Sequence, residues 1–245
     1  MSNTTFCGIL CFMSSIDAKQ HLQIIGEEID SYSSPIVSIP RDFLATEHWV
    51  DLVDATEKDR CEYGYAVGID GQGKAVLSNM LEGYPAITTE DGIELEQASL
   101  TVPMFPFGIL RARQVKKAVL IHTHPMPTFD DRPRTRIFSD KDIGHFFGSD
   151  YLAMIMLDQG GAHLMAKQGR FNRNSWDLLD PKLVETTLLD VRKGSRSMRD
   201  VLSRVAYQLS MHGIGYYYTP DLSQSNDSVG FQNLRRARAV LKPSA

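Results

Sequence analysis

The chain has 245 residues, of which 42% are hydrophobic and 23% are charged, and its formal net charge is −4. This composition is typical of a globular protein with a sizeable core, and it lacks the basic footprint that nucleic-acid-binding proteins carry. The three cysteines, Cys7, Cys11 and Cys61, are too few and too irregularly spaced for a disulfide framework. We therefore expect a reducing, cytoplasmic setting.

Residues 1–35 are predicted to form an N-terminal extension, with a strand at 4–13 and a helix at 17–30. The apolar run "FCGILCFM" is far shorter than the roughly 20 residues that a membrane span needs. It also lacks a basic leader, so we expect neither a membrane anchor nor a secretory signal.

The next part of the chain alternates between strand and helix patterns, with an irregular insert at 82–114 that contains the exposed hairpin or loop "TTEDGIELEQ". The predicted elements are a strand at 36–39, a helix at 41–59, a strand at 61–70 with its hairpin partner at 74–80, a central strand at 118–124, a helix at 139–149, and a strand pair at 151–158 and 162–168.

Residues 175–245 are predicted to form a helical C-terminal extension. Apolar residues at helical spacing indicate helices at 180–194 and 197–213, followed by a flexible loop, "TPDLSQSNDSVG". The tail is locally basic, a pattern that is more typical of a solvated helix face than of a binding site. Its basic residues are Arg235, Arg236, Arg238 and Lys242.

Two histidines stand at the end of the central strand. His122 and His124 are two residues apart, so both point to the same face of the sheet, and Pro125 ends the strand. Two imidazoles that converge at a strand end can occupy two positions of a tetrahedral zinc site. The alternative is that they fill a core.

The helix at 139–149 begins with Ser139, and Asp142 follows three residues later. This spacing predicts a capping box, which needs no metal. The same carboxylate could instead be a third ligand beside the histidines, leaving one position for water as in catalytic zinc sites.

Together, "HTHP" at 122–125 and "SDKD" at 139–142 resemble the motif of the JAMM (MPN+ or JAB) metalloprotease family. The family has a glutamate at the start of an upstream strand, where Glu62 stands here. The order of elements is also similar to the MPN fold, an α/β (α+β) domain, cytidine-deaminase-like, with a central mixed sheet flanked by helices. The resemblance covers roughly 36–170 and implies a metalloprotease domain at 36–174.

Two features of the motif leave alternatives open. Glu57, Glu82 and Glu90 are rivals of Glu62, although its position at a strand start favours Glu62. The spacer 126–138 is longer than is usual in the family, and Thr128–Asp131 offers a closer Thr-x-x-Asp. No apolar helix follows that segment, so Asp142 is preferred.

The resemblance implies one zinc ion held by His122, His124 and Asp142. Glu62 is then expected to carry a proton from water to the leaving amine, and Ser139 to stabilise the oxyanion through its hydroxyl. Cys61 points to the opposite face from Glu62 and is interpreted as a core residue.

The implied substrate is an isopeptide or peptide bond after the C-terminal tail of ubiquitin or a ubiquitin-like protein, as in a bacterial conjugation pathway with an anti-phage role. Met104, Phe105 and Phe107 could line a groove for that tail, or pack as an irregular loop. The C-terminal helices favour a partner protein. The competing hypotheses are a zinc-free MPN scaffold, a RadC-like protein of DNA metabolism, and a hydrolase of small peptide substrates.

Overall fold

The computed structural model describes residues 36–72, 74–85, 87–88, 94–96, 118–125, 137–192, 198–220 and 227–234, together with Leu100, Leu110, Val115 and Leu222. The N-terminal extension expected at 1–35, most of the 126–138 spacer and the basic tail lie outside the described residues.

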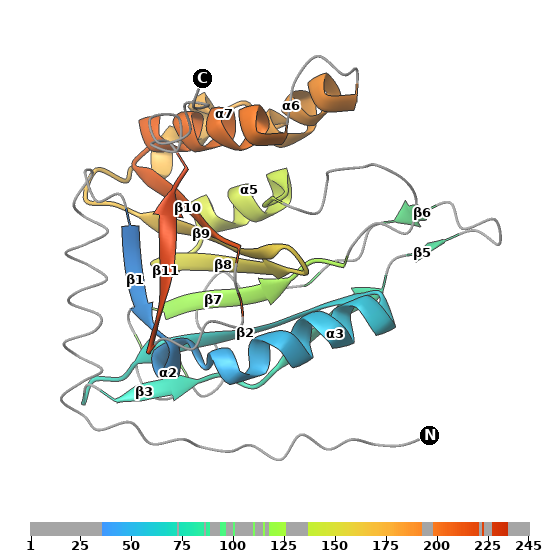
Figure 1. The fold of residues 1–245 in the computed structure, drawn as a ribbon. Coiled ribbons are helices and arrows are strands. Elements are labelled where there is room, and N and C mark those ends of the chain that lie inside the picture. The colour runs from blue at the N-terminus through green and yellow to red at the C-terminus, as the bar shows by residue number, and fades with distance from the viewer. Residues whose placement is uncertain are drawn as a thin grey trace, which may run out of the picture.

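Within this part of the chain, nine strands form one curled, mixed sheet (Figure 1). Their order is β1-β11-β10-β9-β8-β7-β2-β3, and β4 also pairs with β2. The strands are β1 Ile36–Pro40, β2 Cys61–Ile69, β3 Ala75–Leu77, β4 Leu81–Pro85, β7 Ala118–Thr123, β8 Ala153–Asp158, β9 Gly161–Lys167, β10 Ile214–Thr219 and β11 Ser228–Asn233. A separate antiparallel hairpin consists of β5 Ile87–Thr88 and β6 Glu94–Glu96, as the sequence predicts for this insert.

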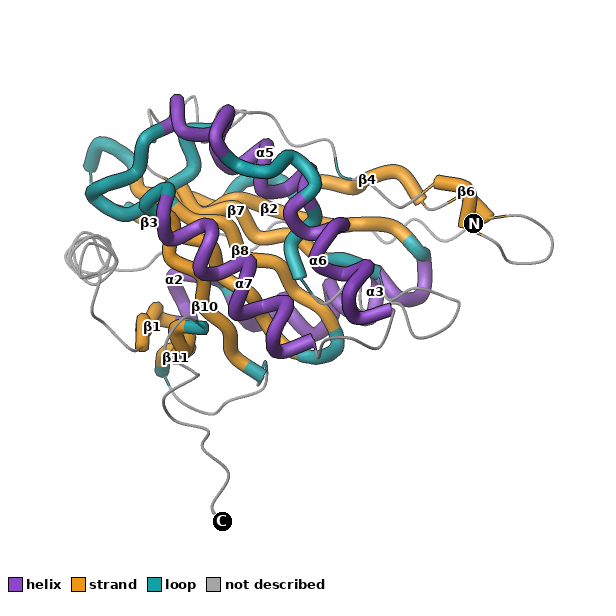
Figure 2. Tube along the Cα trace, turned by 90° about the horizontal axis from the view of Figure 1, so that it is seen from above, coloured by secondary structure: helices purple, strands orange, loops and turns teal. Residues whose placement is uncertain are grey.

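Helices cover both faces of the sheet (Figures 1 and 2). The predicted helix at 41–59 is divided by Ala45, which takes a left-handed backbone conformation at φ 51°. The helical elements are α2 Arg41–Leu44, η1 Thr46–His48, α3 Trp49–Asp59, α5 Asp140–Gly148, η3 Arg173–Leu178, α6 Leu183–Arg192 and α7 Met198–Met211. None of the helices described is long and apolar enough to span a bilayer.

The central strand β7 shows how the two faces are built. All six of its residues are buried, and they alternate between two clusters. Val119 and Ile121 pack toward the cluster of α2 and α3, whereas Leu120 packs toward that of α5, α6 and α7. The predicted central strand, covered on both faces, is therefore confirmed.

The C-terminal part of the chain differs from the prediction. In the described part of 175–245, α6 and α7 are present, but β10 and β11 follow them, and the boundary expected at residue 174 falls inside one sheet. β10 pairs with β9, and β11 pairs with β10 and with the distant β1. The supposed loop at 219–230 therefore contains the start of β11. The run of β10 is rich in residues that favour strands, but the partners of β10 and β11 are determined by the whole sheet, so a sequence window cannot reveal them.

β7 and β8 are parallel neighbours, the one parallel pairing in the described sheet. A parallel pair requires a crossover connection, and here that connection contains α5. The end of β7 and the start of α5 are consequently on the same edge of the sheet. Ligands of α/β proteins bind at such edges.

Candidate metal centre

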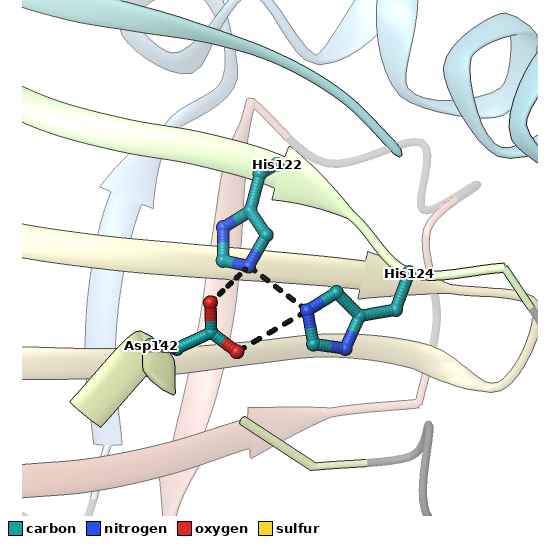
Figure 3. Close-up of side chains that lie close together, drawn as sticks. All are labelled: His122, His124 and Asp142. Carbon is teal, nitrogen blue, oxygen red and sulfur yellow. Dashed lines mark hydrogen bonds and ion pairs between the residues drawn. The ribbon is translucent and has the colours of Figure 1, made fainter. Parts of the chain in front are cut away.

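His122 is the penultimate residue of β7, and His124 directly follows the strand. In the ladder, His122 lies opposite Gly64 of β2 and Met156 of β8. The backbone N–H of His124 donates to the carbonyl of Leu157 at 3.1 Å, which holds the chain against β8 after β7 ends. Both imidazoles are buried and lie on the α5 side of the sheet (Figure 3).

Asp142 is brought to these histidines by the first turn of α5. The predicted capping box is present: the Asp142 N–H donates to the Ser139 hydroxyl at 3.1 Å. The Ser139 N–H and hydroxyl in turn donate to Asp142 Oδ2 at 2.7 and 2.6 Å. Oδ2 is thus fixed by two donors, and the carboxylate is aimed at β7.

The three side chains form a compact triangle. The Nε2 atoms of His122 and His124 are 3.2 Å apart, and Asp142 Oδ1 is 3.4 Å from His122 Nε2. Asp142 Oδ2 is 3.2 Å from His124 Nε2. Ligand bonds of about 2.0–2.1 Å in a tetrahedral zinc site place neighbouring ligand atoms about 3.3–3.4 Å apart. The two histidines face different oxygens of Asp142. With one ligand atom taken from each residue, the atoms lie within 4.8 Å of one another, and these residues could hold a metal ion.

The donor set also fits a cation chemically. Neutral imidazole and carboxylate are typical zinc ligands. Two imidazole nitrogens that face each other can form at most one hydrogen bond, whereas a cation satisfies both. His122 Nδ1 is buried without a hydrogen-bond partner among the described residues, and the ring packs against Phe138, with the two ring centroids 5.9 Å apart.

The charges of the triangle are strongly coupled. Burial acts to raise the pKa of Asp142, but the two histidines outweigh it and hold the pKa well below its usual range. Burial acts to lower the pKa of His124, but Asp142 and then Glu62 raise it to about 9. The pocket therefore favours positive charge at the point where the ligand atoms meet.

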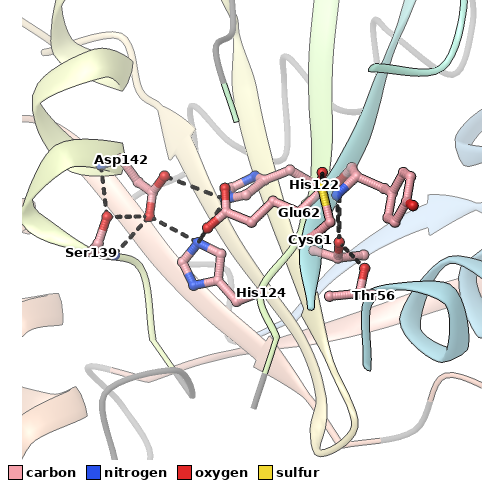
Figure 4. Close-up of polar contacts among 9 residues, drawn as sticks. Thr56, Cys61, Glu62, His122, His124, Ser139 and Asp142 are labelled. Carbon is pink, nitrogen blue, oxygen red and sulfur yellow. Dashed lines mark hydrogen bonds and ion pairs between the residues drawn. The ribbon is translucent and has the colours of Figure 1, made fainter. Parts of the chain in front are cut away.

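Glu62 lies beside this triangle, at the start of β2 (Figure 4). Its Oε1 atom is 3.7 Å from His124 Nε2, and its side chain is 13% exposed. Burial raises the pKa of Glu62, and the negative charge of Asp142 adds to this increase. The two histidines and a hydrogen bond from the Leu100 backbone act in the opposite direction but do not cancel it. The carboxyl group is consequently able to gain and lose a proton closer to neutral pH.

The rival glutamates lie elsewhere. Glu57 is on α3 and forms an ion pair with Arg60 at 3.4 Å. Glu82 is exposed on β4, opposite Tyr63, and Glu90 lies outside the described residues. Cys61 is a buried free thiol whose Sγ donates to the Gly83 carbonyl at 2.9 Å, on the β4 side. The structure thus places Glu62, and neither Glu57 nor Glu82, next to the histidines.

Ser139 is at the site, with its hydroxyl engaged by Asp142. A role at an oxyanion stays a prediction. Met104, Phe105 and Phe107, predicted to line a substrate groove, lie outside the described residues.

Two contributions to the site are not evident from the sequence. Gly64 allows close packing, because a Cβ atom there would be 2.8 Å from the Ile121 carbonyl oxygen and 3.1 Å from His122 Cβ. Thr123, between the two histidines, points to the opposite face and contacts Thr56 of α3. The alternation of side chains along β7 indicates the face to which Thr123 points, but it does not indicate that Thr56 is its partner.

Neither a family model, nor a curated protein, nor a solved structure matches this chain.

Proposed function

We propose that the protein is a zinc-dependent isopeptidase of JAMM type that cleaves after the C-terminal tail of a ubiquitin-like protein. The observation that carries this proposal is the triangle of His122, His124 and Asp142, in which each pair of side chains approaches to 3.2–3.4 Å, with Glu62 beside it. The curled sheet flanked by helices is similar to what the MPN-type fold requires. Zinc bound there would lower the pKa of a coordinated water and polarise a carbonyl group.

Glu62 is the proton carrier in this proposal. Its carboxylate would accept the proton of the attacking water and then donate it to the leaving amine. The raised pKa of Glu62 suits both steps, since a general base and acid works best when its pKa is near the operating pH.

Ser139 would orient Asp142 and stabilise the reacting carbonyl. Its backbone N–H can keep the contact with Asp142 Oδ2 while the hydroxyl turns toward the substrate oxygen, because a hydroxyl hydrogen rotates freely. One donor at a developing oxyanion contributes about 10²- to 10³-fold to the rate in other hydrolases.

The choice of a ubiquitin-like substrate rests on the resemblance of "HTHP" and "SDKD" to the family motif. A cytoplasmic setting agrees with the free thiol of Cys61. A bacterial conjugation pathway would supply such a substrate, and the C-terminal helices α6 and α7 would offer a surface for a partner protein.

A zinc-free scaffold is the second candidate, and one observation favours it. With a pKa of about 9, His124 would be protonated at neutral pH, and it lies between the carboxylates of Asp142 and Glu62. The three groups could then satisfy one another without a metal.

Zinc content per chain separates the two functions. We expect close to one zinc in the wild type and in His48→Ala, a control histidine that pairs with Glu47 near the surface, and little in His122→Ala. The zinc-loaded wild type should also cleave a fusion to the C-terminus of a ubiquitin-like protein. Absence of zinc from the wild type after reconstitution would establish the scaffold instead.

A further inference from the structure

Thr123 has an unusual set of contacts for a residue between two candidate ligands. It is fully buried and points away from the metal centre, toward α3. Its hydroxyl oxygen accepts from the Tyr63 N–H at 2.9 Å and lies 3.2 Å from the Tyr63 carbonyl oxygen, to which it can donate. It also contacts the hydroxyl of Thr56, which is 1% exposed.

These contacts add a side-chain connection at the end of the ladder. The paired residues of β2 and β7 end at Gly64 and His122. In the same antiparallel register, Tyr63 would face Thr123 next. There, the Tyr63 N–H donates to the Thr123 hydroxyl, which can itself donate to the Tyr63 carbonyl.

The Thr123 hydroxyl can use its one donor hydrogen and both of its acceptor lone pairs. A threonine hydroxyl has one hydrogen to donate and two lone pairs. When Thr56 donates to Thr123, Thr123 can donate to the Tyr63 carbonyl and still accept from the Tyr63 N–H. A valine of the same shape would leave both Tyr63 groups without this partner, and such partly buried groups are costly to leave unpaired.

Tyr63 directly follows Glu62, so its backbone determines where the Glu62 carboxylate lies. The Glu62 side chain points to the other face, toward His124 at 3.7 Å. Beyond the regular ladder, the Thr123 hydroxyl connects the end of β7 to the start of β2.

We propose that Thr123, supported by Thr56, is a positioning residue for Glu62, whose hydroxyl holds the start of β2 at the distance from β7 that proton transfer requires. This inference rests on the proposed function, in which Glu62 carries the proton. It assigns to the residue between the histidines a role separate from metal binding.

The test compares Thr123→Val with Thr123→Ser in the full chain. We expect Thr123→Val to keep about one zinc and a nearly unchanged KM while kcat falls about 10- to 100-fold, since a displacement near 1 Å can have that effect. Thr123→Ser keeps the hydroxyl and should restore kcat to within a few-fold. Thr187→Val, which removes a buried hydroxyl that donates within α6, is the matched control and should leave kcat unchanged.

Hydrogen exchange of the Tyr63 amide gives a readout that needs no cleavage. Exchange should be about 5- to 10-fold faster in Thr123→Val and normal in Thr123→Ser, as loss of one hydrogen bond predicts. If Thr123→Val does not fold, Thr56→Val removes only the supporting hydroxyl and should show the same two effects at smaller size.

Three results would overturn the positioning role: unchanged Tyr63 exchange, unchanged kcat in zinc-loaded Thr123→Val, or loss of zinc in Thr123→Val that Thr123→Ser restores. The last would mean that the hydroxyl supports the ligands. Failure of the proposed function looks different, because a wild type without zinc or cleavage would still show the exchange effect.

Discussion

The carboxylate of Glu62 lies 3.7 Å from the Nε2 atom of His124; Glu62 is in β2, and His124 directly follows the antiparallel neighbour β7. The ladder pairs Gly64 with His122. Glu62 and His124 each lie two residues beyond that pair, and their side chains meet at the metal centre (Figure 4). A candidate proton carrier and a candidate metal ligand are thus placed together by strand register.

Glu62→Gln should abolish cleavage without removing the metal. The amide has nearly the same shape as the carboxylate but cannot accept a proton, and loss of a general base typically lowers the rate 10²- to 10⁴-fold. Steady-state kinetics and zinc content on the same preparation measure both quantities. Glu82→Gln, an exposed glutamate on β4, is the control. Near-normal turnover of Glu62→Gln would show that another group carries the proton.

Asp142→Asn should weaken zinc binding. The change removes the negative charge between His122 and His124 and leaves the size of the side chain nearly unchanged. We expect at least the 10- to 100-fold loss of affinity that removal of an outer-shell partner causes, measured by competition with a chelator.

Asp140→Asn is the matched control on the same helical turn. Its carboxylate accepts from the N–H groups of Val184 and Glu185 at 2.9 and 3.0 Å, at the start of α6, and does not face the histidines. Equal zinc affinities of the two variants would contradict the assignment of Asp142 as a ligand.

Gly64→Ala should destabilise the fold and disturb the metal site together. The new Cβ would lie 2.8 Å from the Ile121 carbonyl oxygen, which cannot move without shifting β7. Overpacking of this kind costs about 1–3 kcal/mol of the free energy of unfolding. Because His122 is in the same rung, zinc affinity should also fall.

Gly71→Ala, in the turn before β3, is the control for Gly64→Ala, since nothing lies within 4 Å of the new Cβ. Urea denaturation and zinc titration of both variants provide the comparison. A Gly64→Ala protein as stable as Gly71→Ala would show that β2 and β7 can separate without cost.

His163 should make the protein less stable in acid. It is 2% exposed and its Nδ1 is 3.0 Å from the Tyr216 hydroxyl. Burial, and then the charge of His124, lowers its pKa to about 3. In the unfolded chain the imidazole binds a proton below about pH 6.5, whereas in the folded chain it does not. Its contribution to stability is therefore complete above pH 6.5 and is lost as the pH falls toward 3.

The difference should appear as a slope of up to about 1.4 kcal/mol per pH unit in the free energy of unfolding between pH 6.5 and 3. His163→Gln should lack this component, and the surface variant His48→Gln should retain it. Urea denaturation with a chelator present in all samples keeps metal binding out of the comparison. Parallel pH profiles for wild type and His163→Gln would contradict the buried neutral state.

The sequence by itself determined the local geometry of the candidate site. The period of two along a strand places His122 and His124 on one face, and the capping-box spacing aims Asp142 back at Ser139. Both predictions depend on backbone geometry over a few residues, and the structure has both features. The burial of β7 on both faces was likewise readable from its unbroken apolar run.

Only the tertiary structure decided which distant residues meet. The choice among Glu62, Glu57 and Glu82 depends on the register of β2 against β7, and register is determined by packing across the sheet. The predicted helical extension contains neither β10 nor β11. The run "IGYYYT" is rich in residues that favour strands, so β10 agrees with its local sequence, whereas its pairing with β9 is decided by the fold. β11 begins within a polar segment and is completed by β1, far away in the chain, so its structure is determined by the partner that the fold supplies.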